Sequence, residues 1–492
     1  MILPPMAAVA GAAHDSIAPG PAEPMRVAWF SPMPPSMSGI AAYSAELLPR
    51  LQSPALHVDV FAEPPGCDSP GVMAAREFVW MHRRQPYDLT VYHLGNARCH
   101  DYMWGYLFRY PGLVILHDAQ VHQARAQSLL ERWRPRRADY LAEFAANHPD
   151  APSDLGLLFE AGLGGSLYAH WPLVDLVLKT ARLAAVHSPA LARRLCETSG
   201  VDVETVPMGV ADPLEERATL TAAEVRARHW VPQEAVVVGA FGGVTPEKRL
   251  PELLGAVAAL AERQPHLHVL VVGAAAAHYD VAADAAERGL ADRVHVTGFV
   301  DDADLGAYLA ATDICACLRW PSNGETSASW WRAMAAGRAT IITDLVHQPE
   351  LPVVDPRGWR TLGAPGAAPV AVAIPILDER HTLVEALDVL ARSATTRVEI
   401  GSEARRYWRA RHTLEHMAEP YRILLPRAAA RRAPAVELPA HLKVEGDEHL
   451  TALLAPFGLD TPTGVSGGVT TGRRRPLTPS TASGDRARQQ RR

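Results

Sequence analysis

Four consecutive residues, Gly324-Glu325-Thr326-Ser327, stand where a buried apolar run gives way to a helical pattern that Gly337 closes. At this point the Glu325 carboxylate can accept hydrogen bonds from sugar hydroxyls, while the N–H groups of Thr326 and Ser327 face a phosphate. A structural loop could use Glu325 as a first-turn acid, but that would not explain the order of the four residues. The segment therefore predicts a binding site for a phosphorylated sugar.

A second loop of this kind follows an apolar run over residues 235–240 and leads into an amphipathic helix. Its residues of interest are Gly242, Gly243, Glu247, Lys248 and Arg249. Glycines allow the chain to turn beneath a ligand, and Lys248 can place a positive charge against a diphosphate. Taken alone, the loop could also be a helix cap that carries a solvated Lys-Arg pair.

Further polar residues and glycines follow strand-like runs in the first half of the chain. They are Gly39, Gly95, Asn96, His117 and Asp118. A histidine at the end of a strand can hydrogen-bond a sugar hydroxyl or stabilise a departing phosphate, and Asp118 can orient it. A capping aspartate in an ordinary polar turn is the alternative. His117 and His122 lack a spacing that would fix a metal ion, so no metal site is predicted.

These loops need a scaffold that brings them to one edge of a sheet. Short apolar runs alternate with helical patterns, which is typical of parallel sheets with helices on both faces. In the first half, the predicted strands are 26–30, 56–62, 88–94, 113–116 and 183–187. In the second half they are 235–240, 267–272, 293–297, 313–318, 339–343 and 370–374, with a helix over 250–263. Ligands of such sheets bind beyond the carboxyl ends of the strands.

The pattern predicts two α/β domains between two terminal extensions. The first domain covers residues 25–210 and the second covers 232–400, with a charged linker over 211–231. A further helix is expected within 401–432. The extensions 1–24 and 433–492 are rich in small residues, prolines or arginines. They offer little apolar surface to bury and are expected to be disordered.

Composition excludes several classes of protein. The chain has 492 residues and a net charge of -6, which argues for more than one core and against a global basic field for nucleic acid. Its five cysteines lack CxxC spacing, which argues against a disulfide framework or structural zinc. No run of about 18 apolar residues occurs, so we expect a cytoplasmic protein, soluble or peripheral at the inner face of the membrane.

The arginines and Trp133 within Arg125–Arg137 could touch anionic lipid or glycan; a solvated amphipathic helix is the alternative.

The two loops resemble those of retaining glycosyltransferases of the GT-B fold, in particular glycosyltransferase family 4, over most of Met25–Leu425. In that family a strand is followed by Gly-Arg-Leu-x-x-Glu-Lys-Gly, which holds the nucleotide diphosphate. Gly242 to Arg249 matches this loop and retains Glu247 and Lys248. The Gly-Glu-Thr-Ser order is similar to a bacterial branch of the family. Other stretches that resemble it are the Gly39 loop, Tyr92-His93-Leu94-Gly95-Asn96, His117-Asp118, Val206–Val210 and the helix near Ser402–Leu425.

The sequence departs from the family at two positions. Gly243 stands where the family has an arginine, which removes a cation unless Arg249, Arg319 or another side chain supplies it. Arg332 precedes Ala333-Met334, where the family has a second glutamate that contacts the nucleotide ribose.

The resemblance implies an α/β protein with two Rossmann-like domains whose parallel sheets face a cleft, and a C-terminal helix that crosses back to the first domain. It implies transfer of a hexose from a nucleotide-sugar co-substrate to a glycan, lipid-linked or small-molecule acceptor, without metal, other cofactor or nucleic acid. The expected catalytic residues are His117, Asp118 and Glu325. The expected donor-binding residues are Gly242, Gly243, Glu247, Lys248, Arg249, Gly324, Thr326 and Ser327. Gly39, Gly95 and Asn96 are expected in an acceptor or phosphate loop.

Three rival functions share parts of this pattern. A nucleotide-sugar epimerase of the same fold would need carboxylates that assist addition of water. A non-catalytic binding protein related to glycosyltransferases would explain the missing arginine and glutamate. A phosphorylase would need a lysine-bound pyridoxal group and usually a longer chain.

Overall fold

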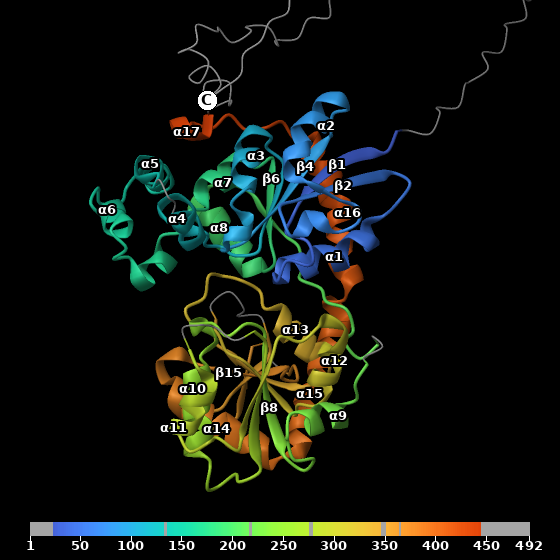
Figure 1. Cartoon of the computed structure of the whole chain (residues 1–492), viewed down its shortest axis with the longest axis vertical. Helices are drawn as coiled ribbons and strands as arrows, with labels where there is room; N and C mark the ends of the chain where they lie inside the picture. The colour runs from blue at the N-terminus through green and yellow to red at the C-terminus, as the bar shows by residue number, and fades with distance from the viewer. Residues whose placement is uncertain are drawn as a thin grey trace, which may run out of the picture. The chain divides into compact units, whose positions relative to one another are not determined.

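The computed structural model describes residues 23–131, 135–215, 219–274, 279–345, 351–363 and 366–443. Two β-sheets organise these residues, and both belong to one compact unit that ends at Lys443 (Figure 1). We call the part built on the first sheet the N-terminal domain and the part built on the second sheet the C-terminal domain. The disorder predicted for 1–22 and 444–492 falls on residues outside the described ranges.

The first sheet has parallel strands in the order β3-β2-β1-β4-β5-β6-β7. The strands are β1 (Met25–Phe30), β2 (Leu56–Ala62), β3 (Val72–Ala74), β4 (Leu89–Leu94), β5 (Leu113–Leu116), β6 (Leu183–Val186) and β7 (Val203–Thr205). Alternate residues of a strand point to opposite faces. Val27 and Trp29 of β1 accordingly belong to one apolar core, while Ala28 and Phe30 belong to another. Burial on both faces explains why the strands are continuous apolar runs.

Helices cover both faces of this sheet. They are α1 (Gly39–Leu51), α2 (Phe78–Arg84), α3 (Met103–Arg109), α4 (His122–Leu130), α5 (Arg137–Asn147), α6 (Leu155–Glu160), α7 (Asp175–Thr180) and α8 (Pro189–Ser199). Helix α1 begins at Gly39, because the Ser38 side chain caps it by accepting a hydrogen bond from the Ile40 N–H at 3.3 Å. Helices α4 to α7 form an insertion between β5 and β6.

The second sheet has the order β10-β9-β8-β11-β12-β15-β13-β14, and its described strands pair in parallel except that β14 is antiparallel to β13. Its strands are β8 (Val236–Phe241), β9 (Leu267–Val272), β10 (Val294–Gly298), β11 (Ile314–Cys317), β12 (Ala339–Thr343), β13 (Val353–Asp355), β14 (Arg360–Leu362) and β15 (Ala371–Ile374). Its helices are α9 (Ala222–Arg228), α10 (Leu250–Ala259), α11 (Val281–Glu287), α12 (Leu305–Ala310), α13 (Ala328–Ala335), α14 (Glu379–Arg392) and α15 (Ala394–Arg411).

Each predicted strand is present to within one residue at either end, whereas β3, β7, β13 and β14 were not predicted. Each of these four strands has only 3 residues, too few to show a period in the sequence. The helix predicted over 250–263 ends at Ala259.

The segment 211–231, predicted as a linker, contains helix α9. Thr221 and Glu224 form a capping box at its start, a sequence signal that the charged composition concealed. Val225 and Val231 are buried in an apolar core of the C-terminal domain. Most of this segment therefore belongs to that domain rather than to a free linker.

The helix predicted within 401–432 is in fact two helices. Helix α15 ends at Arg411 and packs in the C-terminal domain, and α16 (Leu414–Ala430) packs against α1 of the N-terminal domain. The break lies at His412, whose carbonyl accepts a hydrogen bond from the Val210 N–H at 3.0 Å, and Thr413 caps α16. The Tyr421 hydroxyl of α16 hydrogen-bonds the Tyr43 hydroxyl of α1 at 2.9 Å. The chain thus returns to the first domain through α16.

The structure corrects one expectation about the surface in part and bears on another at Arg125. Part of the extension predicted as disordered is ordered, because α17 (Ala440–Lys443) packs on the N-terminal domain and His441 contacts Glu143 at 2.7 Å. Arg125 is buried rather than solvated, and it binds Glu143 and Asp101. Arg136 and Arg137 pair with carboxylates of α5 and α6. Residues 132–134, including Trp133, lie outside the described ranges.

Among the described residues, no helix is long and apolar enough to cross a membrane.

Candidate functional site

The loops after β8 and β11 meet at one edge of the second sheet, because these parallel strands are neighbours. The Trp320 N–H donates to the Glu247 carbonyl at 2.7 Å, which joins the two loops directly. The Arg319 N–H donates to the Thr343 hydroxyl at 2.9 Å and ties the second loop to β12. Sequence-distant residues therefore share one edge, as the strand pattern predicted.

Lys248 is a partly buried cation of this edge. Its Nζ donates to the Phe241 carbonyl, and a side chain at Gly242 would collide with it. Gly242 also has a φ of 91°, which favours glycine. Burial lowers the pKa of Lys248 to about 8, and the positive charge of Arg319 acts in the same direction. Arg319 therefore lies close enough to Lys248 for its positive charge to act on this amine.

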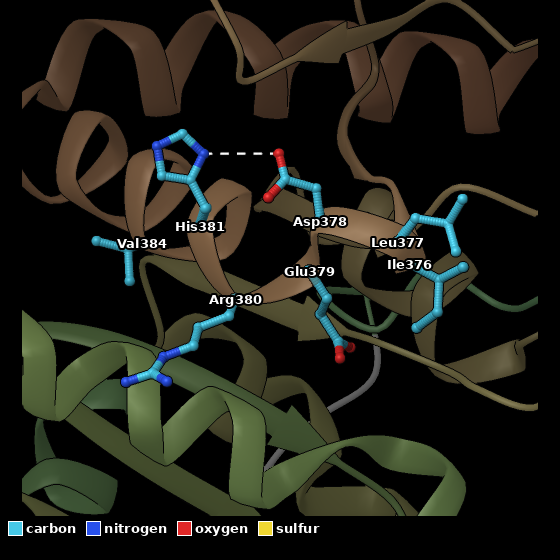
Figure 2. Close-up of a pocket in the computed structure, with 7 residues that line it drawn as sticks. All are labelled: Ile376, Leu377, Asp378, Glu379, Arg380, His381 and Val384. Carbon is cyan, nitrogen blue, oxygen red and sulfur yellow. Dashed lines mark ion pairs between the residues drawn. The ribbon is translucent and has the colours of Figure 1, made fainter.

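Arg249 has a different role from its neighbour. Its guanidinium pairs with Glu379 at 2.5 Å and with Glu252 at 2.9 Å, so it joins α10 to α14. Glu379 belongs to a depression at the start of α14 that is lined by Ile376, Leu377, Asp378, Glu379, Arg380, His381 and Val384 (Figure 2). Figure 2 shows His381 facing Asp378, at 3.6 Å, while Glu379 points away from this pair. Neither Lys248 nor Arg249 is thus the solvated cation of the alternative interpretation.

Glu325 is held inside its own loop. It accepts hydrogen bonds from the Asn323 N–H at 2.6 Å and the Ser322 hydroxyl at 3.1 Å, and it pairs with Arg319 at 2.7 Å. Helix α13 begins at Ala328, with Ser327 as its cap, so Thr326 precedes the helix. The free N–H groups of the helix end therefore begin at Ser327, one residue later than predicted.

The loop that carries Glu325 touches the N-terminal domain. The Ala119 N–H donates to the Asn323 carbonyl at 2.7 Å. A Cβ atom at Gly324 would lie 2.8 Å from the Ala119 Cβ, and the φ of Gly324 is 75°, so only glycine fits this approach comfortably. Gly324 thus has a role in packing between the domains.

Asp118 faces Glu325 from the opposite domain. It accepts a hydrogen bond from the Asn96 N–H at 2.6 Å. Burial and the negative charge of Glu325 raise its pKa to about 7. A side chain at Gly95 would lie 2.6 Å from the Ile40 Cδ1 and 3.0 Å from an Asp118 oxygen. Asp118 is therefore a carboxyl group that can hold or release a proton near neutral pH.

The remaining predicted residues of the first domain lie around Asp118 but play other parts. Asn96 is structural, since its side-chain oxygen accepts from the Ala124 N–H at 2.9 Å and its amide donates to Gln120 at 2.9 Å. At Gly39, no described atom lies within 4 Å of the position that a Cβ would take.

His117 is buried with an exposed fraction of 6%. Its ring nitrogens bond His93 at 2.9 Å and His187 at 3.0 Å. This arrangement disagrees with a direct contact between His117 and a sugar.

Several neighbours of the site left no signal of their role in the sequence. His93 resembled the family only as part of a longer phrase, and His187 marked only the end of a predicted strand. Arg332, at the second family departure, pairs with Glu46 of α1 across the domains. Such partners are recognisable only after the two sheets are placed, because they are separated by tens to hundreds of residues.

A cavity between the domains lies beside this edge. It is lined by His187, Ser188, Pro189, Thr205, Pro207, Thr326, Trp331, Leu351, Tyr407, Ala410, Arg411, His412 and His416. The rings of Trp331 and His412 stack at 3.6 Å, and Arg411 lies over the Tyr407 ring at 4.7 Å. The described part of the lining combines aromatic rings and one arginine with aliphatic and hydroxyl-bearing side chains, and it contains no carboxylate. Within the described ranges, no group of three or more His, Cys, Asp and Glu side chains could hold a metal ion.

The fold is that of known GT-B proteins. Sucrose-phosphate synthase from Thermosynechococcus elongatus superposes with a TM-score of 0.54 at 17% identity, covering 82% of this chain and 98% of that chain. HepE from Anabaena, in complex with UDP and glucose, has a TM-score of 0.52 at 16% identity and covers 82% and 100%. A glycosyltransferase from Rickettsia africae has a TM-score of 0.55 at 12% identity and covers 83% and 100%. Together with the two parallel-stranded α/β domains, these likenesses define a GT-B fold.

The second domain carries the sequence similarity. Residues 234–374 match the family model described as glycosyl transferases group 1. The 2-deoxystreptamine glucosyltransferase of Streptomyces kanamyceticus is 31% identical over 175 residues, which are 34% of this chain and 44% of that protein. The chain therefore spans less than half the length of this curated relative. Residues 234–374 therefore resemble a glycosyl transferases group 1 domain within a chain of GT-B fold.

Proposed function

We propose that the protein transfers a sugar from a nucleotide-sugar donor to a hydroxyl group of an acceptor, with retention at the anomeric carbon. The observation that carries this proposal is the edge formed by Lys248, Arg319 and Glu325 within the matched domain. It lies beside the free end of α13 and faces Asp118 of the other domain.

The two cations suit the departure of a nucleoside diphosphate. Breaking the bond between the anomeric carbon and the phosphate oxygen leaves negative charge on the phosphate, and groups placed in advance stabilise it most. Lys248 is held by a backbone carbonyl and Arg319 by Glu325, so both are in place before the donor binds. With a pKa of about 8, Lys248 is mostly protonated at neutral pH.

Retention requires that the acceptor oxygen attack from the face that the phosphate leaves. In the proposed reaction the bond from the anomeric carbon to phosphate oxygen breaks, the bond to the acceptor oxygen forms, and the acceptor proton passes to the departing phosphate. No protein nucleophile, metal ion or further cofactor is then needed. Glu325 would position the donor sugar, and closing of the domains would exclude water as a competing acceptor.

The cavity between the domains supports an acceptor class. The aromatic rings that line the cavity suit the apolar face of a sugar ring, and Arg411 contributes a positive charge to the lining. Because its described lining lacks a carboxylate, a neutral or anionic hydroxylated ring is favoured over a diamine such as 2-deoxystreptamine, which carries positive charge at neutral pH. A glycan, a lipid-linked sugar or a small glycoside would meet this condition, the second at the surface of a membrane.

The test is incubation of the purified protein with a panel of nucleotide sugars, beginning with UDP-glucose, and with neutral, anionic and cationic saccharides. We expect release of nucleoside diphosphate together with a new glycoside of unchanged anomeric configuration, detected by NMR. An isomerised donor sugar without a glycoside would instead identify an epimerase. If neither product forms although nucleotide binds, the protein is a non-catalytic binding protein. Lys248→Met is the matched control for release that depends on the proposed site.

A further inference from the structure

A chain of imidazoles runs beneath the cleft of the N-terminal domain. The Nδ1 of His93 lies 2.9 Å from the Nε2 of His117, and the Nδ1 of His117 lies 3.0 Å from the Nε2 of His187. The chain ends where the Nδ1 of His187 lies 3.0 Å from the Val206 carbonyl oxygen. All three rings are buried, at the ends of the neighbouring strands β4, β5 and β6.

The Val206 carbonyl at one end of this row determines which nitrogen of each ring carries the hydrogen. A carbonyl oxygen only accepts, so the Nδ1 of His187 must carry a hydrogen. In a neutral ring the Nε2 of His187 then accepts, and the Nδ1 of His117 must donate to it. By the same step, the Nε2 of His117 accepts from the Nδ1 of His93. Each of the three neutral rings is therefore the Nδ1–H tautomer.

The surroundings favour neutral rings. His93 packs on Trp29 at a centroid distance of 4.5 Å, and His117 packs edge-on against Tyr43 at 4.8 Å. Burial lowers the pKa of His187 to about 4 and lowers those of His93 and His117 well below 6.5. For His93 and His117 the neighbouring histidines act in the same direction. An additional proton on His117 would also set two N–H groups against each other at His93.

The middle ring of this row of imidazoles and the Val206 end lie next to parts of the fold that join the two domains. His117 precedes Asp118 and Ala119, which face the Glu325 loop. Val206 begins the segment that crosses to the C-terminal domain, where the Met208 carbonyl accepts from His412 at 2.8 Å. The imidazoles therefore join the loop that carries Asp118 to the crossing segments between the domains.

We infer that His93, His117 and His187 are positioning residues, a neutral hydrogen-bonded chain that holds the Asp118 loop in register with the crossing segment. His117 has no nitrogen left for a ligand, so it acts through Asp118 rather than by touching the sugar. The kinetic part of this inference rests on the proposed function, whereas the tautomers do not.

The tautomers are tested on the full-length protein labelled with ¹⁵N-histidine, with resonances assigned by His93→Asn, His117→Gln and His187→Gln. We expect all three rings to show a protonated Nδ1 and a bare Nε2, with no titration from pH 8 to about 5.5, the reverse of the Nε2–H form that free histidine prefers. A protonated Nε2 on His117, or titration of any of the three rings in this interval, would refute the proposed row of neutral, hydrogen-bonded imidazoles.

The positioning role is tested by a matched pair at His93, whose Nδ1 makes the hydrogen bond to His117. Asparagine places an amide N–H near that position, whereas leucine removes the donor. We expect His93→Leu to lower kcat about tenfold with the donor KM unchanged, because small misplacements of a reacting group are costly, and His93→Asn to recover most of the loss. Equal kcat for wild type and His93→Leu would refute positioning. Absence of diphosphate release in the wild type would refute the proposed function and leave the NMR result standing.

Discussion

The facing edges of the two sheets are built from opposite kinds of groups. The edge of the C-terminal domain carries the cations Lys248 and Arg319 with Glu325. The edge of the N-terminal domain carries buried neutral imidazoles, and Asp118 there is a carboxyl with a pKa raised to about 7. The edge of the C-terminal domain thus carries charged side chains, whereas the pKa values of the titratable groups at the N-terminal edge are shifted toward their neutral forms.

The difference shows what each edge can recognise. A phosphorylated nucleotide needs fixed positive charge, and the edge that we propose to bind it lies within the segment that matches a glycosyltransferase family model. A neutral edge suits an uncharged acceptor or the sugar being moved. In the N-terminal domain a buried ion pair, Arg125 with Glu143, lies in the helical insertion instead and stabilises the fold. Ion pairs therefore have structural roles in both domains, as Arg125 with Glu143 and Arg249 with Glu379, whereas the chemical role of charge is proposed for the C-terminal edge alone.

The largest expected effect comes from removing the buried charge of the N-terminal domain. Arg125→Met leaves Glu143, whose side chain is 0% exposed, without its bidentate partner. Loss of one member of a buried pair typically costs about 3–5 kcal/mol, which urea unfolding would measure. The control is Arg136→Met, which removes an exposed pair with Asp139 and should cost less than about 1 kcal/mol. Similar costs for both variants would contradict a structural role for the buried pair.

Next in size is the effect of Lys248→Met, which removes the partly buried cation of the C-terminal edge. We expect kcat/KM to fall about a hundredfold, equivalent to about 3 kcal/mol, with little change in the free energy of unfolding. Arg249→Met is the neighbouring control and should behave in the opposite way, because it leaves Glu379 unpaired and destabilises the fold. If Lys248→Met keeps more than about a third of kcat/KM while Arg249→Met abolishes it without unfolding, the diphosphate contact belongs to Arg249.

Asp118→Asn should stabilise the protein at high pH. The folded state raises the pKa of Asp118 from 3.8 to about 7, so folding becomes less favourable as pH rises from about 4 to about 7 and the loss is complete above that. Asparagine is neutral at all pH values. We expect the variant to be more stable than wild type by about 2 kcal/mol at pH 8, about half of what the full pKa difference corresponds to, because solvent screening and relaxation reduce it. Below about pH 4 the two proteins should be equally stable. A gain that does not depend on pH would show that Asp118 is not the titrating group.

A smaller effect is expected at Arg319, which we propose as the second cation of the diphosphate site. Arg319→Gln should lower kcat/KM about tenfold, or about 1.4 kcal/mol. Arg319→Lys keeps the charge but loses the fork that pairs with Glu325, and should recover part of the activity. Identical losses in both variants would mean that Arg319 serves only to hold Glu325.

The smallest expected effect is that of a chelator. Because fixed cations of the C-terminal edge are proposed to replace a metal ion at the diphosphate, EDTA should leave the rate of diphosphate release nearly unchanged. A complete loss that added divalent cation restores would place a metal in the reaction and remove the need for the Lys248 and Arg319 pair.

Local pattern was sufficient for much of the scaffold. Apolar runs predicted the long strands to within one residue at each end, because burial on both faces leaves an uninterrupted signal. Strands of 3 residues and helix α9 escaped, since a short segment shows no period and a capping box can be hidden among charges. The single helix predicted within 401–432 is interrupted at His412, whose carbonyl accepts a hydrogen bond from Val210, far away in the sequence, and Thr413 caps the second helix.

The sequence by itself determined the order of the strands along the chain and the loops that follow them, so Lys248, Glu325 and Asp118 could be singled out as residues of one cleft. Only the tertiary structure decided their partners. It paired Arg249 with Glu379, set Arg319 beside Lys248, and engaged both nitrogens of His117. The physical reason is the sequence distance over which each property is determined. The periodicity of a strand or helix depends on neighbouring residues. The position of the proton on a buried imidazole, or the charge of a carboxyl group, depends on atoms that only packing brings within a few ångströms.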